Sequence, residues 1–70
     1  MNQQDITLTL NGQPQTFRGS QLSALLAEHT RATQSFAVAV NGRFVPRTAY
    51  NSTTLGDGDR VEILIPMQGG

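Results

Sequence analysis

The chain has 70 residues, enough for one small domain with an economical core, because small chains bury a smaller fraction of their surface. It contains no cysteine, which excludes disulfides and cysteine-based zinc sites, and five acidic residues balance five arginines. The arginines are spread along the sequence, so the basic stripe of a nucleic-acid-binding protein is absent. No apolar run approaches the roughly 18 residues that cross a bilayer, and the first residues do not resemble a signal peptide. We therefore expect a cytoplasmic protein with neither nucleic-acid nor membrane partners.

The N-terminal part of the chain predicts a β-hairpin. Polar and apolar residues alternate over residues 5–10, the pattern of a strand with one buried face. The apolar face of this strand consists of Ile6, Leu8 and Leu10. Asn11-Gly12 follows and suits the positive φ angles of a tight hairpin turn. The second strand is expected from about Gln15 to Arg18, with Phe17 as its large apolar residue.

A short amphipathic helix is expected next, from Gln21 to about Thr30. Gly19 interrupts the strand, and the hydroxyl of Ser20 is a good N-cap for the first helical turn. The apolar stripe recurs at i, i+3, i+4 and i+7 and consists of Leu22, Leu25, Leu26 and His29. A helix of about three turns does not hold alone in water, so it must pack on a sheet.

A second hairpin is predicted in the middle of the chain. Residues 36–40 alternate large and small side chains, Asn41-Gly42 repeats the turn dipeptide, and Pro46 ends the strand of residues 43–45. The first of these strands is expected to turn Phe36, Val38 and Val40 inward and Ala37 and Ala39 outward.

The last strand is predicted at residues 60–65, after an irregular segment over 47–55 and a glycine-rich turn over 56–59. Its inward residues are Val61, Ile63 and Ile65, and its apolar character favours a central position in the sheet. One helix covering one face of a mixed sheet buries all of these stripes economically. The expected fold class is α+β: a β-grasp (ubiquitin-like) domain over residues 1–66, with a mixed four- to five-stranded sheet.

The titratable side chains do not predict an active site. Asp57 and Asp59 lie in a turn, where aspartate is favoured for its backbone hydrogen bonds. His29, near the end of the helix, is expected to interact with the helix dipole or to cover the edge of the core. The remaining carboxylates fall at a strand start, late in the helix and on an outer face: Asp5, Glu28 and Glu62. We therefore expect a protein that is not an enzyme and binds neither a metal nor a cofactor itself.

Two features of the C-terminal part favour a function. Alternation places Leu64 on the outer face of the sheet, between the threonines of residues 5–10 and the outward alanines, as expected of a docking surface. Beyond Pro66 we expect residues 67–70 to form an extended, mobile tail. Gly69 and Gly70 lack a Cβ, so the tip can enter a narrow channel, and a partner can activate the Gly70 carboxylate with ATP. In a chain without cysteine, sulfur can then be carried as a thiocarboxylate.

Nearly the whole sequence resembles the ThiS-type sulfur carriers of thiamine thiazole biosynthesis. The resemblance rests on Val40-Asn41-Gly42 with Val45-Pro46-Arg47, on the segment from Leu55 to Val61, and on Gly69-Gly70. The glycine pair and the Asp-Gly-Asp turn are shared by many ubiquitin-like proteins, whereas the Asn-Gly-x-x-Val-Pro-Arg segment is more specific. Tyr50 stands where many relatives have tryptophan.

The resemblance implies a cosubstrate of other enzymes. A ubiquitin-activating-type adenylating enzyme would adenylate Gly70 with MgATP, a persulfide relay fed by a cysteine desulfurase would supply sulfur, and thiazole synthase would consume it. Gly70 would carry the chemistry, Gly69 would give access, and Leu64, Met67 and Gln68 would contact partners. Three alternatives remain open: a carrier for molybdopterin or amino-acid sulfur, a ubiquitin-like protein modifier, and a plain β-grasp interaction module.

Overall fold

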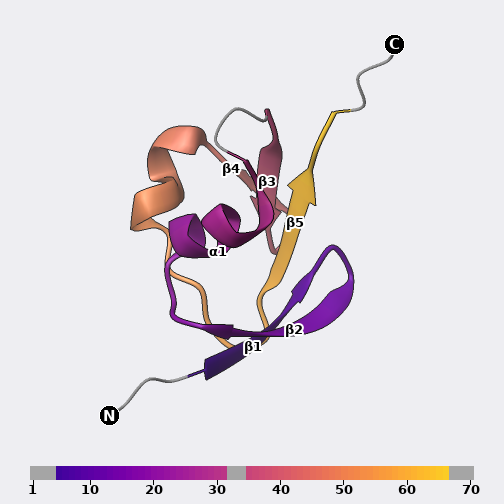
Figure 1. Cartoon of the computed structure of the whole chain (residues 1–70), viewed down its shortest axis with the longest axis vertical. Helices are drawn as coiled ribbons and strands as arrows, with labels where there is room; N and C mark the ends of the chain where they lie inside the picture. The colour runs from indigo at the N-terminus through magenta and orange to yellow at the C-terminus, as the bar shows by residue number, and fades with distance from the viewer. Residues whose placement is uncertain (1–4, 32–34, 67–70) are drawn as a thin grey trace.

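In the computed structural model, which describes residues 5–31 and 35–66, five strands form one mixed sheet with an α-helix on one face (Figure 1). The strands are β1 (Asp5–Leu10), β2 (Gln13–Arg18), β3 (Ala37–Val40), β4 (Arg43–Val45) and β5 (Arg60–Leu64). The helices are α1 (Leu22–His29) and the 3-10 helix η1 (Arg47–Ser52). The order across the sheet is β2-β1-β5-β3-β4, so the last strand is central, as predicted. The β-grasp prediction is confirmed.

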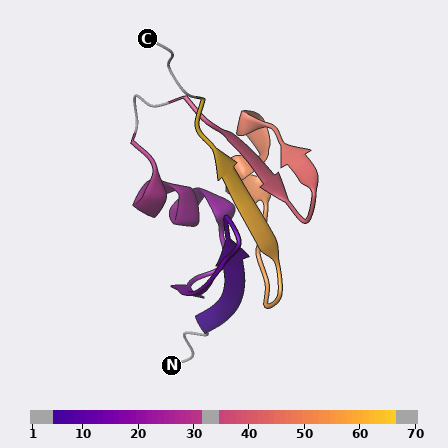
Figure 2. The ribbon, with the colours of Figure 1, turned by 90° about the vertical axis from the view of Figure 1, so that its right-hand side faces the viewer.

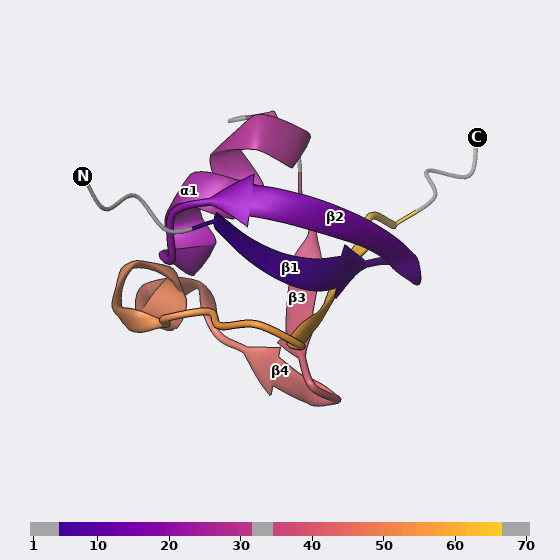
Figure 3. The same ribbon diagram turned by 90° about the horizontal axis from the view of Figure 1, so that it is seen from below.

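The central strand β5 has a parallel neighbour on one side and an antiparallel neighbour on the other. It pairs in parallel with β1 through Thr9–Arg60 and Leu10–Val61, and antiparallel with β3 from Ala37–Leu64 to Val40–Val61. β2 and β4 close the two edges as antiparallel hairpin partners. The sheet is strongly twisted, and seen from below the β1–β2 hairpin crosses β3 at a steep angle (Figure 3). β1 begins at one end of the molecule and β5 ends at the other (Figure 2).

Both Asn-Gly dipeptides form the predicted hairpin turns. Asn11 and Asn41 have φ angles of 52° and 53°, and the following glycines have 85° and 84°, the left-handed conformations that glycine and asparagine tolerate best. Each asparagine also contacts β5. The side-chain oxygen of Asn11 accepts a hydrogen bond from the Ile63 amide at 2.8 Å, and that of Asn41 accepts one from the Arg60 amide at 2.9 Å. The two turns therefore hold the central strand from both sides.

The core lies between the sheet and α1. Its buried members are Leu8, Leu10, Phe17, Leu22, Leu25, Leu26, Val38, Leu55, Val61 and Ile63. Burying one such aliphatic side chain contributes about 1.5–3 kcal/mol, so three leucines anchor the eight-residue helix that could not persist alone. In the part of the chain that the structure describes, no helix is long and apolar enough to span a membrane.

The start of the helix differs from the prediction. The N-cap is Gln21, with no side-chain capping bond, and Ser20 precedes it. The reason is a short bridge to a distant segment: the Ser20 carbonyl accepts a bond from the Leu55 amide, and the Leu22 amide donates one to the Thr53 carbonyl. This extended pairing occupies the backbone where a capping turn was expected. His29 lies in the last helical turn but is exposed, so it is not part of the buried stripe.

Three further predictions are corrected: the burial of Ile65, the irregular segment and the start of β2. Ala39 lies on the outer face, as predicted, although it is only 5% exposed because it lies in register between the larger residues Phe44 and Glu62. Ile65, expected in the core, is 48% exposed because the ladder with β3 ends one residue earlier. The segment predicted to be irregular contains η1, and β2 begins at Gln13 rather than at Gln15.

Candidate functional site

The outer face of the sheet, opposite α1, carries two large apolar side chains on β4 and β5. Leu64 is 49% exposed, as strand alternation predicted, and it lies in register beside Ala37. Phe44 on β4 is 71% exposed and lies in register beside Ala39, which in turn faces Glu62 on β5. We call Phe44, Ala37, Ala39, Glu62 and Leu64 the outer patch. The two alanines of the patch lie on β3, between β4 and β5. Phe44 on β4 and Leu64 on β5 therefore lie on either side of a strand with small outward side chains.

The predicted surroundings of Leu64 are correct on one side only. Ala37 lies beside it on β3, but the threonines of β1 do not reach it, since the parallel register pairs Thr9 with Arg60 at the opposite end of β5. Thr7 is further away still, and its amide donates to a carboxylate oxygen of Asp57 at 2.8 Å. The outer patch is therefore built on the second hairpin and β5, without β1.

Phe44 was not identified from the sequence, because its orientation follows from the pairing of β4 with β3. Val45 pairs with Val38, whose side chain is completely buried, so the residue before Val45 must point to the other face. An aromatic residue between Arg43 and the strand-ending Val45-Pro46 is therefore outward on a hairpin edge. Exposed aromatic groups are enriched in protein interfaces, which makes Phe44 a stronger contact candidate than a lone leucine.

The acidic residues of the 56–59 turn are used in structural bonds. One Asp59 oxygen accepts from the Gly56 amide at 2.9 Å and the other from the Asn41 side-chain amide at 3.1 Å. Asp57 accepts from the Thr7 amide, so the two carboxylates tie the turn to β1 and to the second hairpin. Over residues 5–31 and 35–66, no group of three or more His, Asp or Glu side chains could hold a metal ion. These bonds hold in place the turn that directly precedes β5.

The predicted tail lies outside the described residues. Met67, Gln68, Gly69 and Gly70 follow Pro66, and their roles as partner contacts, access residue and acyl carrier stay predictions. The described chain does fix where the tail begins. β5 ends at Leu64, at one end of the molecule and beside the first residue of β3 (Figure 2). A partner that contacts Leu64 is thus within a few residues of the tail.

Comparisons with known proteins agree with this architecture. The model of the ThiS family matches residues 8–70. A crystal structure of the thiamine biosynthesis protein ThiS from Geobacter metallireducens is 37% identical, with a TM-score of 0.76 over 93% of this chain and 100% of that chain. An NMR solution structure of a thiamine biosynthesis protein from the same organism is 39% identical, with a TM-score of 0.74 over 93% and 88% of the two chains. No curated protein sequence matches. The family model covers the β-grasp core, the outer patch and the glycine pair, and the chain belongs to the ThiS family.

Proposed function

We propose that this protein is a sulfur carrier of thiamine biosynthesis that acts as a cosubstrate of partner enzymes in the cytoplasm. The observation that carries the proposal is the family match, which extends from β1 through Gly70. The similar structures from Geobacter metallireducens support it, since both are thiamine biosynthesis proteins and both cover more than nine-tenths of this chain. The described fold is consistent with a carrier role, because the carboxylates of Asp57 and Asp59 are engaged in structural bonds.

The proposed chemistry takes place at the Gly70 carboxylate, on a partner adenylating enzyme of the ubiquitin-activating type. The carboxylate attacks the α-phosphorus of MgATP, and pyrophosphate leaves to give an acyl-adenylate. A persulfide fed by a cysteine desulfurase attacks the acyl carbon through its terminal sulfur, and AMP leaves. A thiol then cleaves the resulting S–S bond, which gives the thiocarboxylate that thiazole synthase consumes. MgATP belongs to the activating enzyme, and this chain supplies the acyl group.

We assign docking of the activating enzyme to the outer patch. Leu64 and Phe44 present apolar surface on the same face, and Met67 and Gln68 would extend the contact along the tail. Gly69 would let the tip enter a channel too narrow for a side chain. A contact of this kind is strongest where aromatic and aliphatic anchors enter pockets on the partner, so the binding energy should concentrate in Phe44 and Leu64.

Intact-mass measurement tests the proposal directly. The protein is incubated with MgATP, the host's adenylating enzyme and a sulfide source, and we expect a mass gain equal to the exchange of one oxygen for one sulfur. Deleting Gly70 should abolish the gain without changing the fold. No gain, with an enzyme shown to be competent on another carrier, would refute the carrier chemistry. An amide-linked adduct on other proteins would indicate a protein modifier instead.

Leu64→Glu tests the docking face separately. We expect at least a tenfold loss of affinity for the adenylating enzyme by calorimetry, because the change places a charge in an apolar contact. Thr16→Glu is the matched control, since it adds the same charge to an exposed position on the far edge strand β2. Equal affinities for the two variants would remove Leu64 from the interface.

A further inference from the structure

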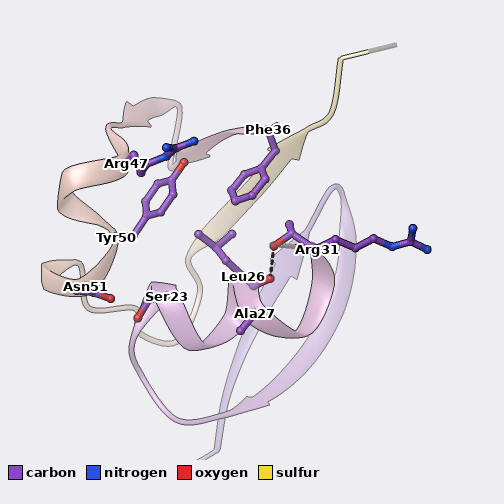
Figure 4. A pocket seen from close by; sticks show the side chains of 9 residues that line it. Ser23, Leu26, Ala27, Arg31, Phe36, Arg47, Tyr50 and Asn51 are labelled. Atoms are coloured by element: carbon purple, nitrogen blue, oxygen red, sulfur yellow. Dashed lines mark hydrogen bonds between the residues drawn. The ribbon is translucent and has the colours of Figure 1, made fainter. Parts of the chain in front are cut away.

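A second surface feature lies on the helix side of the sheet and is not used by the proposed sulfur chemistry. It is a cavity of about 400 Å³ between α1, η1 and the residue that precedes β3 (Figure 4). Its lining consists of Ser23, Leu26, Ala27, Thr30, Arg31, Phe36, Arg47, Tyr50 and Asn51. This size falls within the range of ligand-binding pockets.

Two aromatic rings and one buried leucine form the apolar part of the cavity. The rings of Phe36 and Tyr50 are stacked with their centroids 5.9 Å apart and an angle of 12° between their planes. Leu26 belongs to α1 and is 3% exposed, and Figure 4 shows its side chain pointing from the helix toward the two rings. The Thr30 hydroxyl donates to the Leu26 carbonyl at 2.7 Å, which fixes the helical wall. The apolar part is therefore built on packed elements.

Polar groups lie at the two ends of the cavity, and the charged residues of its lining are arginines. Arg47 and the Tyr50 hydroxyl lie at one end and Ser23 and Asn51 at the other, whereas the Arg31 side chain points away (Figure 4). None of the described residues that line the cavity is acidic. A guanidinium at the rim of an acid-free cavity favours a carboxylate partner. The charge complementarity thus points to an anionic group next to an apolar one.

The exposure of the lining distinguishes a protein segment from a small molecule. Only Leu26 is buried; Ala27, Arg31, Arg47 and Asn51 are exposed, and the rest are half-buried. A small ligand in such an open cavity would keep much of its surface in water, whereas binding pockets enclose most of theirs. A protein segment can anchor one side chain here and leave its flanks in solvent. The open lining therefore favours a segment of a partner protein.

We propose that this cavity docks a partner segment that inserts an aliphatic side chain against Leu26, Phe36 and Tyr50 and sets a neighbouring carboxylate against Arg47. The site lies on the side of the sheet opposite Leu64, because Leu64 alternates with the core residue Ile63. A partner on the outer patch and a second partner at this cavity can consequently be bound together. The proposal does not depend on the sulfur chemistry.

A peptide titration followed by amide chemical shifts tests the proposal. The probe is acetyl-Gly-Leu-Asp-Asp-Gly-amide, and the control peptide replaces both aspartates with asparagine. We expect saturable shifts at Ala27, Tyr50 and Asn51, with Phe44 and Leu64 unmoved, and weaker binding of the control peptide by about two- to fivefold, the size of an exposed ion pair. The absence of saturation, or shifts centred on the outer patch, would overturn the proposal.

Arg47→Gln tests the proposed contact between Arg47 and the carboxylate of the partner segment. Arg47 is exposed, so its replacement should leave the fold intact and remove the preference for the acidic peptide. Arg43→Gln is the matched control, because it removes the same charge from an exposed residue outside the cavity and should keep the preference. A preference for the acidic peptide that survives Arg47→Gln would refute the assignment.

A small-molecule control tests whether the occupant is a protein segment. Isovalerate binding as tightly as the peptide would also refute the proposal, since the cavity would then accept a free small anion. Neither measurement uses ATP or the adenylating enzyme, so failure here leaves the carrier proposal untouched.

Discussion

The two hairpins of this protein begin from the same turn and serve different surfaces. In the first, β1 and β2 pair along their whole length, and Leu8, Leu10 and Phe17 enter the core. In the second, β3 and β4 pair only from Val38–Val45 to Val40–Arg43, and Phe44 points to solvent. Both turns are Asn-Gly dipeptides at positive φ, and both hold β5 by an asparagine side chain. The turn sets the geometry of a hairpin, and the residues of its edge strand decide whether it stabilises the fold or presents a contact.

The largest contrast is expected between the aromatic residues of the two edge strands. Phe17→Ala should lower the free energy of unfolding by about 3–5 kcal/mol, since Phe17 is 4% exposed. A domain of this size has roughly 4–10 kcal/mol in total, so much of the stability would be lost. Phe44→Ala should change stability by less than about 0.5 kcal/mol. Urea unfolding of both variants measures the difference, and similar values would contradict the division between the hairpins.

A smaller contrast is expected between the two turns. Asn11→Gly and Asn41→Gly both keep a residue that tolerates positive φ and both remove a side-chain bond to β5. The Asn11 bond to Ile63 is half-buried, so its loss should cost about 1–2 kcal/mol. Asn41→Gly removes two bonds, to Arg60 and to Asp59, but both are exposed and water can replace them, at a cost of about 0.5–1 kcal/mol. Chemical denaturation measures the free energy of unfolding of both variants, and we expect the larger loss for Asn11→Gly. The reverse order would show that the second turn is the stronger clamp.

The smallest effect is expected at the open end of the first hairpin. Asp5 and Arg18 are register partners and form a salt bridge at 3.5 Å, with side chains that are 49% and 73% exposed. Such a pair is screened by solvent and salt, so Asp5→Asn should change stability by less than about 0.5 kcal/mol. Thermal unfolding at low and high salt checks this. A larger, salt-dependent loss would mean that charge rather than burial holds the first hairpin.

Residue alternation predicted most of the sheet because each strand has one face on the core. It failed at Ile65, which lies beyond the end of its ladder, and it gave the face of Ala39 but not the cover that its cross-strand neighbours provide. The Ser20 cap also failed, because the carbonyl of Ser20 pairs with Leu55, 35 residues away, at 2.6 Å. These contacts are non-local, and no local pattern encodes them.

The candidate site was predictable to a different degree in each of its parts. Leu64 followed from the period of its own strand, and Phe44 required the pairing of its strand with β3. The cavity beside Tyr50 could not be foreseen, because η1 fell in a segment with no periodic pattern. The roles of Gly69 and Gly70 were predicted from their chemistry and from family resemblance, and they stay predictions because both residues lie outside the described ones.

If partners hold the C-terminal end, as proposed above, the central position of β5 has a mechanical consequence. A pull at Pro66 is directed along β5 and loads its hydrogen bonds with β1 and β3 in shear, so many bonds must yield together rather than one after another. The Asn11 bond to Ile63 lies close to the loaded end and would share the force from the outset. Under the proposed function, a partner enzyme could therefore pull on the C-terminal end while the domain stays folded.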